Sequence, residues 1–133
     1  LDPDVAVEAA PCPLLVPLAE EGGGDHPITD QGAETYLRPL LDRGIEVLIL
    51  GCTHYPLLLP SLARVAGPSV RLVDSASSVT DTVVRDHGDL LRGTASPAGR
   101  LRLQLTDRSD RFLRIAGSIL GAAPEDVELV DVV

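Results

Sequence analysis

The chain has 133 residues, of which 44% are hydrophobic, so it is long enough to bury a core and too apolar to be disordered throughout. Its 11 basic residues, all of them arginine, stand against 20 acidic residues, which gives a net charge of −9. This acidic balance disfavours nucleic acid or an anionic membrane surface as a partner, and an aromatic content of 2% leaves few side chains for base stacking. No apolar stretch approaches the roughly 18 residues of a membrane span, so we expect a soluble globular protein.

Short β-rich runs alternate with longer helical ones along the chain. Residues 22–24 (GGG) lack the Gly-Lys-Ser/Thr tail of a phosphate loop and indicate a flexible turn. Thr29 or Asp30 would cap the helix that follows, and Gly44 would end it. The alternation predicts an α/β fold, three-layered, with a mostly parallel sheet. The predicted strands cover 5–7, 46–50, 70–73, 101–105 and 127–130, and the predicted helices cover about 29–43, 57–65, 77–91 and 109–120; residues 11–17 (PCPLLVP) are broken by proline and receive no element.

The apolar run 46–50 (EVLIL) is typical of a buried parallel strand, and a thiol, a hydroxyl and an imidazole follow it directly. These side chains belong to Cys52, Thr53 and His54. Ligands bind beyond the carboxyl ends of parallel strands, where helix N-termini present free N–H groups. We therefore expect a site here, in which backbone N–H groups near Cys52 hold a carboxylate and His54 assists the thiol.

The strand at 70–73 ends in the same kind of sequence. Asp74 and Ser75 follow it, and we expect them to hold the turn and cap the next helix rather than take part in chemistry.

Simpler interpretations of these residues stay open on the sequence alone. Cys52 could be a small residue that fills a strand end, and His54 could be a loop histidine bonded to backbone. Cys12, between two prolines, is typical of a packed residue. A Cys-x-His spacing is not that of the common zinc sites and no Cys-x₂-Cys occurs, so we predict no metal. Two cysteines are too few for a disulfide scaffold and no secretory signal is visible, which favours the cytoplasm.

The sequence then resembles a known family. Residues 51–58 (GCTHYPLL) match, without a gap, the second catalytic-cysteine motif of bacterial glutamate racemases. Residues 12–22 (CPLLVPLAEEG) are similar to the family's Cys-Pro-Leu-Phe-Val-Pro-Leu-Val-Glu segment. Residues 72–76 (LVDSA) and 103–121 resemble later parts of the same proteins, so the resemblance covers nearly the whole chain in order.

This resemblance implies cofactor-independent interconversion of L- and D-glutamate by two opposed cysteine bases, which supplies D-glutamate for peptidoglycan. Cys52 would be one base, while Thr53 and His54 would contact the substrate or tune the thiol. Glu20 falls in the slot of an assisting acid, and Glu21 would fill it if the register shifted by one. The Cys-Thr-His-Tyr-Pro sequence of the motif favours glutamate over aspartate as substrate. Whether the protein forms a homodimer stays open.

The resemblance also implies a missing part. The family's first catalytic-cysteine motif and its Asp-Ser motif do not occur here, and Cys12 matches a non-catalytic position. The chain lacks Met and begins Leu-Asp-Pro, so we expect the C-terminal half of a two-lobed racemase-like fold. Residues 1–74 would form most of one lobe, with Cys52, and 75–133 would return to the other, which leaves the chain alone inactive.

Two interpretations from other classes remain. The chain could be a thiol hydrolase with Cys52 as nucleophile and His54 or His87 as base, which would form an acyl intermediate without exchange of a Cα proton. It could also be a non-catalytic remnant or an interaction module.

Overall fold

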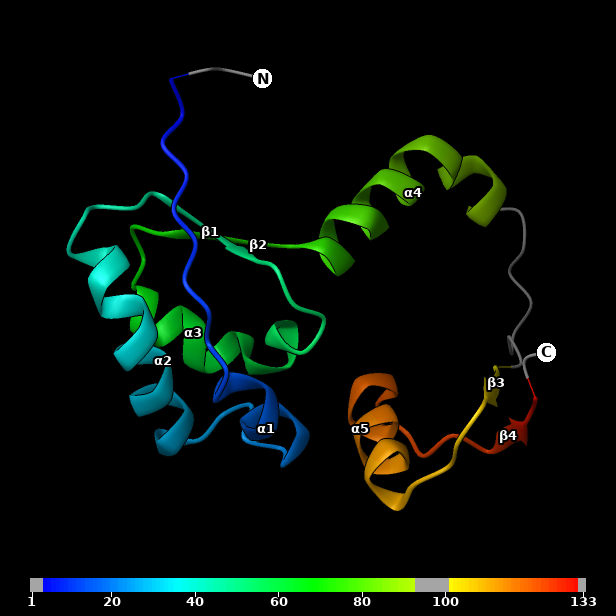
Figure 1. The fold of residues 1–133 in the computed structure, drawn as a ribbon. Helices are drawn as coiled ribbons and strands as arrows, with labels where there is room; N and C mark the ends of the chain where they lie inside the picture. The colour runs from blue at the N-terminus through cyan, green and yellow to red at the C-terminus, as the bar shows by residue number, and fades with distance from the viewer. Residues whose placement is uncertain (1–3, 93–100, 132–133) are drawn as a thin grey trace. The chain divides into compact units, whose positions relative to one another are not determined.

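The computed structural model describes residues 4–92 and 101–131, which belong to two compact units, Leu1–Thr80 and Asp81–Val133 (Figure 1). The division falls inside helix α4 (Ser75–Arg92). The assignment of 1–74 and 75–133 to opposite racemase lobes stays a prediction.

The first unit is built around a parallel pair of strands. Strand β1 pairs with β2 in parallel, and the register places Leu50 opposite Asp74 at the last pair. Helices α2 and α3 pack against each other, and α1 packs against the 3₁₀ helix η1 (Figure 1). The strands predicted at 46–50 and 70–73 are confirmed to within a residue, and the helix predicted at 57–65 begins earlier, as η1. The elements in order are α1 (Leu15–Glu20), α2 (Pro27–Leu41), β1 (Val47–Leu50), η1 (Tyr55–Leu58), α3 (Leu59–Ala66) and β2 (Arg71–Asp74).

The second unit contains the C-terminal part of α4, which confirms the helix predicted at 77–91, followed by a strand–helix–strand element. Its strands β3 (Arg102–Leu105) and β4 (Asp126–Leu129) are parallel, with helix α5 (Asp110–Leu120) between them. The Ser109 side chain accepts a hydrogen bond from the Phe112 backbone N–H at 3.1 Å and so caps α5. The predicted elements of this region, and the α/β fold with parallel strands, are confirmed.

One apolar cluster forms the core of the first unit. Cys12 belongs to it and is 7% exposed, which confirms the expectation of a packed residue. On β1 only alternate residues face this core: Val47 is 50% exposed and Ile49 is 71% exposed, so the expectation of a strand buried on both faces is wrong for this chain. The cluster consists of Cys12, Leu15, Ala19, Ala33, Leu37, Leu50, Leu58 and Leu62.

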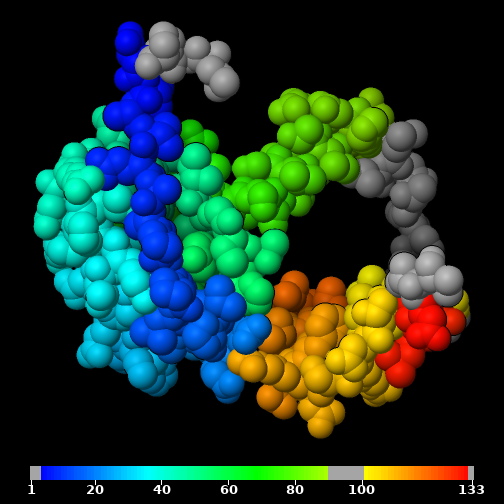
Figure 2. All heavy atoms as spheres, in the orientation of Figure 1, coloured from blue at the N-terminus to red at the C-terminus, as the bar shows by residue number. Residues whose placement is uncertain are grey.

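The segment before α1 differs from the prediction. Residues 5–7 form no strand: they are exposed, and the one strand pair described in the first unit is β1 with β2. In Figure 2 this dark-blue start of the described chain projects from the unit. Glu8 in this segment forms an ion pair with Arg43. The proline-broken run at 11–17 leads into α1, which the sequence did not predict. Pro17 is tolerated because it lies in the first helical turn, where backbone N–H groups have no helical partner.

Helix α2 begins earlier than predicted and with another cap. Pro27 is its first residue, and the His26 imidazole accepts a hydrogen bond from the Ile28 N–H at 3.2 Å. Proline at the first position suits a helix because its missing N–H has no partner there. Neither Thr29 nor Asp30 is therefore the cap: Asp30 lies in the first turn of α2, and the fully buried Thr29 side chain bonds to the glycine turn instead.

Arg64 of α3 ties α2 and the preceding loop together. Its guanidinium holds Asp30 through two hydrogen bonds, of 2.9 and 3.2 Å, and Asp25 at 2.7 Å. The bond from Arg64 lowers the pKa of the Asp30 carboxyl below its usual 3.8. A lowered carboxyl pKa contributes stability above the unfolded-state value, and this stability is lost as the pH falls through the folded-state value.

We expect the melting temperature of the first unit to fall on acidification below about pH 4, and to fall less in Asp30→Asn. Thermal unfolding at pH 7 and pH 3 checks this. Arg64→Gln should flatten the pH dependence in the same way, and a drop of unchanged size in both variants would contradict the prediction.

Candidate active site

The carboxyl ends of β1 and β2 form one edge of the sheet, and a hollow of about 300 Å³ opens there. The two polar strand ends singled out in the sequence therefore meet, as the pairing of Leu50 with Asp74 requires. Thr53 and the half-buried Cys52 lie on one side of the hollow, and the start of α4 lies on the other. The lining residues are Ile49, Leu50, Gly51, Cys52, Thr53, Val73, Asp74, Ser75 and Ser78.

A thiol, an imidazole and a carboxylate form a contact series beside this hollow. Cys52 Sγ lies 3.8 Å from His54 Nδ1, within hydrogen-bond range for sulfur. His54 Nε2 lies 3.4 Å from Glu20 Oε1, and both side chains are about one-third exposed. When the imidazole donates its Nε2–H to Glu20, Nδ1 presents its lone pair to the thiol and can accept the thiol proton. The structure thus brings together three of the predicted site residues.

Glu20 reaches His54 because it is the last residue of α1, which packs against η1 directly after His54. Its neighbour Glu21 is the C-cap of α1 and is exposed. Of the two candidates for the assisting acid, the structure gives Glu20 the ion-pair distance to His54. The catalytic role of either residue stays a prediction.

Asp74 caps α4, as expected. Its Oδ1 accepts a hydrogen bond from the Ser77 N–H at 2.9 Å, and this bond lowers the pKa of the buried Asp74 carboxyl. The Ser78 hydroxyl donates to the Asp74 carbonyl at 2.7 Å. Ser75 is the first residue of the helix. A capped helix end therefore forms one side of the hollow.

The glycine turn is tightly packed, which the sequence did not indicate. A Cβ on Gly24 would lie 2.5 Å from the Leu57 carbonyl oxygen, and one on Gly23 would lie 2.9 Å from the Leu18 carbonyl oxygen. Gly22 has a φ of +79°, the left-handed conformation that favours glycine. The turn is confirmed, but steric demand explains its glycines better than flexibility does.

Tyr55 links the motif to the segment before α1. Its hydroxyl donates to the Cys12 carbonyl at 3.4 Å, and burial raises the pKa of this hydroxyl. Residue patterns alone predict no role for Tyr55 beyond its place in the motif.

Comparison with known proteins identifies the family. The family model described as Asp/Glu/Hydantoin racemase matches residues 4–83, more than half of the chain. The chain belongs to this family.

Its racemase relatives share sequence over nearly all of the chain. The glutamate racemase of Syntrophus aciditrophicus (strain SB) is 42% identical over 134 residues, which cover 98% of this chain and 48% of that protein. The glutamate racemase of Geobacter metallireducens is 40% identical and covers 96% of this chain and 47% of its own length. The crystal structure of glutamate racemase from Francisella tularensis in complex with D-glutamate matches with a TM-score of 0.74 at 32% identity, over 98% of this chain and 49% of that one. The chain thus spans about half the length of the curated relatives it matches.

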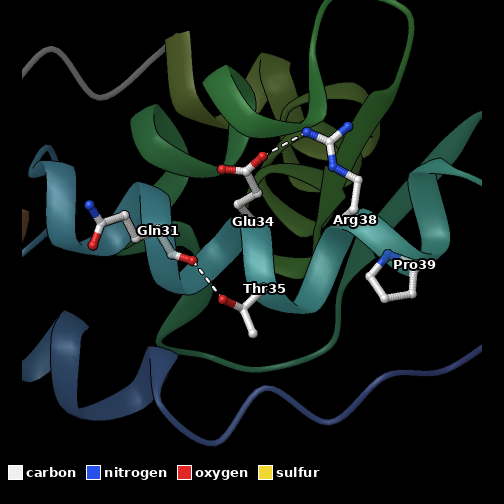
Figure 3. Close-up of a pocket in the computed structure, with 5 residues that line it drawn as sticks. All are labelled: Gln31, Glu34, Thr35, Arg38 and Pro39. Carbon is white, nitrogen blue, oxygen red and sulfur yellow. Dashed lines mark hydrogen bonds and ion pairs between the residues drawn. The ribbon is translucent and has the colours of Figure 1, made fainter.

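A second, larger hollow of about 470 Å³ lies on the exposed face of α2 and is lined by Gln31, Glu34, Thr35, Arg38 and Pro39 (Figure 3). Arg38 pairs with Glu34 at 2.6 Å, and the Thr35 hydroxyl donates to the Gln31 carbonyl at 2.9 Å. Arg38, the one cation among the lining residues, is thus already paired with a carboxylate, and none of the racemase motif residues lines this hollow.

In the described ranges, no helix has the length and apolar character needed to cross a membrane. Over the same ranges, no three His, Cys, Asp or Glu side chains are grouped so that they could hold a metal ion.

Proposed function

We propose that this chain carries one face of a glutamate racemase active site, with Cys52 as one of two opposed proton-transferring thiols. The observation that carries the proposal is the contact series Cys52–His54–Glu20 at the edge of the sheet. It lies in a chain about 40% identical to glutamate racemases. The relatives are glutamate racemases, which supports racemisation as the reaction. The geometry supports Cys52 as the proton-transferring group, because a base, His54, lies beside its thiol.

In one direction of the reaction, the Cys52 thiolate removes the Cα proton of glutamate, and a thiol on the opposite face donates a proton to the same carbon. The centre is inverted, and the two thiols have exchanged protonation states. The reverse reaction uses each thiol in the other role. No cofactor is needed, because a proton leaves and a proton returns.

His54 and Glu20 would keep the thiol ready for this exchange. Nδ1 takes the thiol proton, and the resulting imidazolium is stabilised by the Glu20 carboxylate at Nε2. Thr53, which lines the hollow, would bind a substrate carboxylate through its hydroxyl.

The opposing thiol does not come from Cys12. That residue lies in the apolar core, and burial raises the pKa of its thiol. With only two cysteines in the chain, racemisation requires the part of the racemase fold that the relatives have and this chain does not span. We therefore propose that the chain alone is inactive, and that the whole enzyme supplies D-glutamate for peptidoglycan in the cytoplasm.

A chimera tests this proposal. In it, residues 4–131 of this chain replace the matching half of the Syntrophus aciditrophicus glutamate racemase. We expect the chimera to racemise L-glutamate in deuterated water with deuterium uptake at Cα, and the 133-residue chain alone to do neither. Optical rotation and proton NMR measure the two readouts together.

Turnover by the isolated chain would contradict the need for a second half. A folded chimera without Cα exchange would contradict the racemase assignment, and an acyl intermediate on Cys52 would then favour a thiol hydrolase.

A further inference from the structure

The loop between α1 and α2 is held from inside the first unit by a buried hydroxyl. Thr29, fully buried, donates from Oγ1 to the Gly23 carbonyl at 2.6 Å. The Gly23 N–H donates in turn to the Leu18 carbonyl at 2.9 Å. Both polar groups of the Gly23 backbone are therefore bonded to neighbouring elements, one to α2 and one to α1.

The same loop lies directly on the backbone of η1. Gly24 approaches the Leu57 carbonyl so closely that a Cβ would lie 2.5 Å from its oxygen. The Leu57 N–H donates to the His54 carbonyl at 3.0 Å. No side chain of Gly24 separates the two backbones, so the position of the loop is transmitted to the turn that carries His54.

The contact between the glycine loop and η1 adjoins both residues of the Glu20–His54 ion pair. Glu20 ends the helix before the loop, and His54 precedes η1 on the other side. Their Oε1–Nε2 distance is 3.4 Å, within ion-pair range but longer than the roughly 2.7–2.9 Å of a charge-assisted hydrogen bond. A shift of a few tenths of an ångström between loop and η1 would therefore make or break the contact.

We propose that Thr29 is a positioning residue for the site: its bond to Gly23 seats the glycine loop on Leu57 and thereby holds Glu20 within reach of His54. The importance of that contact for catalysis rests on the proposed function. The contact itself can be measured without racemase activity, so the two can fail separately.

The test uses the alkylation rate of Cys52 by iodoacetamide in the full 133-residue chain, followed by mass spectrometry. The rate depends on the thiolate fraction and on access to the thiol. Because Cys12 is buried in the core, its protection from the reagent shows that each variant is folded. Glu20→Gln removes the carboxylate directly and sets the size of the effect, which we expect to be about threefold slower alkylation of Cys52.

Thr29→Val removes the hydroxyl and keeps the shape of the side chain. We expect it to slow Cys52 alkylation as Glu20→Gln does, while Thr29→Ser, which retains the hydroxyl, restores the parent rate. Thr35→Val is the matched control, because Thr35 lies on the same helix, is exposed, and bonds only within α2 among the contacts that the structure gives it. It should leave the rate unchanged.

Parent-like alkylation in Thr29→Val, with Cys12 protected, would overturn the proposal, as would a parent-like rate in Glu20→Gln. If Thr29→Val exposes Cys12 in the isolated chain, the same substitution in the chimera decides the matter. There a loss in kcat at unchanged KM supports a positioning role, and unchanged kcat overturns it.

Discussion

Replacement of Cys52 by serine in the chimera is expected to lower kcat for L-glutamate racemisation by about 10³-fold or more. A serine hydroxyl is a far weaker acid than a thiol, so it can neither be deprotonated by His54 near neutral pH nor accept and return the Cα proton at a useful rate. Deuterium uptake at Cα should fall together with the change in optical rotation. Both are measured in deuterated water.

Cys12→Ala is the matched control for this substitution. The Cys12 side chain lies in the core and faces no substrate, so the variant should keep the kcat of the chimera within a few-fold. Parent-like exchange in Cys52→Ser would remove Cys52 from the mechanism. It would also remove the reason for assigning His54 a role as its partner.

The meeting of the two polar strand ends could be predicted from the sequence. Parallel strands can be predicted from their apolar runs, even though β1 is not buried on both faces, and parallel pairing brings their carboxyl ends to one edge of the sheet. The runs ending at Leu50 and Val73 therefore already implied that Cys52 and Asp74 would lie near each other. The capping role of Asp74 followed from local chemistry alone.

The position of Glu20 could not be predicted from residue patterns. The three prolines in residues 11–17 prevented the prediction of α1. A proline in the first turn of a helix cannot be told apart in sequence from one that breaks a helix. Without the helix, nothing distinguished Glu20 from Glu21. Only the packing of α1 on η1 brings the Glu20 carboxylate to His54.

The contacts that hold the glycine loop in place could not be predicted either, because they join segments that are distant in the sequence. Thr29 stands after the glycine loop, at the start of the helical run, and threonine is one of the residue types that favour the N-cap. His26 and Pro27 take over the helix start, which frees the Thr29 hydroxyl for Gly23. Three successive glycines likewise indicate flexibility until the neighbour at Leu57 is known.

Substitution of Gly24 by alanine is expected to destabilise the first unit by about 1–3 kcal/mol. The new methyl group would lie 2.5 Å from the Leu57 carbonyl oxygen, a backbone atom that cannot rotate away as a side chain would. Either the loop or η1 must move, and the core residue Leu58 moves with η1. Urea unfolding followed by tyrosine fluorescence measures the effect.

Both tyrosines of the chain, Tyr36 and Tyr55, lie in the first unit, so their transition reports on that unit alone. Gly51→Ala is the control, because a Cβ there meets no atom within 4 Å and Gly51 has no positive φ. Its transition should lie within about 0.5 kcal/mol of the parent. If Gly24→Ala unfolds at the same urea concentration as Gly51→Ala rather than at a clearly lower one, the loop moves without loss of stability. The contact with Leu57 is then not a rigid one. A rigid contact is what the loop needs if it is to set the distance between Glu20 and His54, so this result would weaken the role of Thr29 as well.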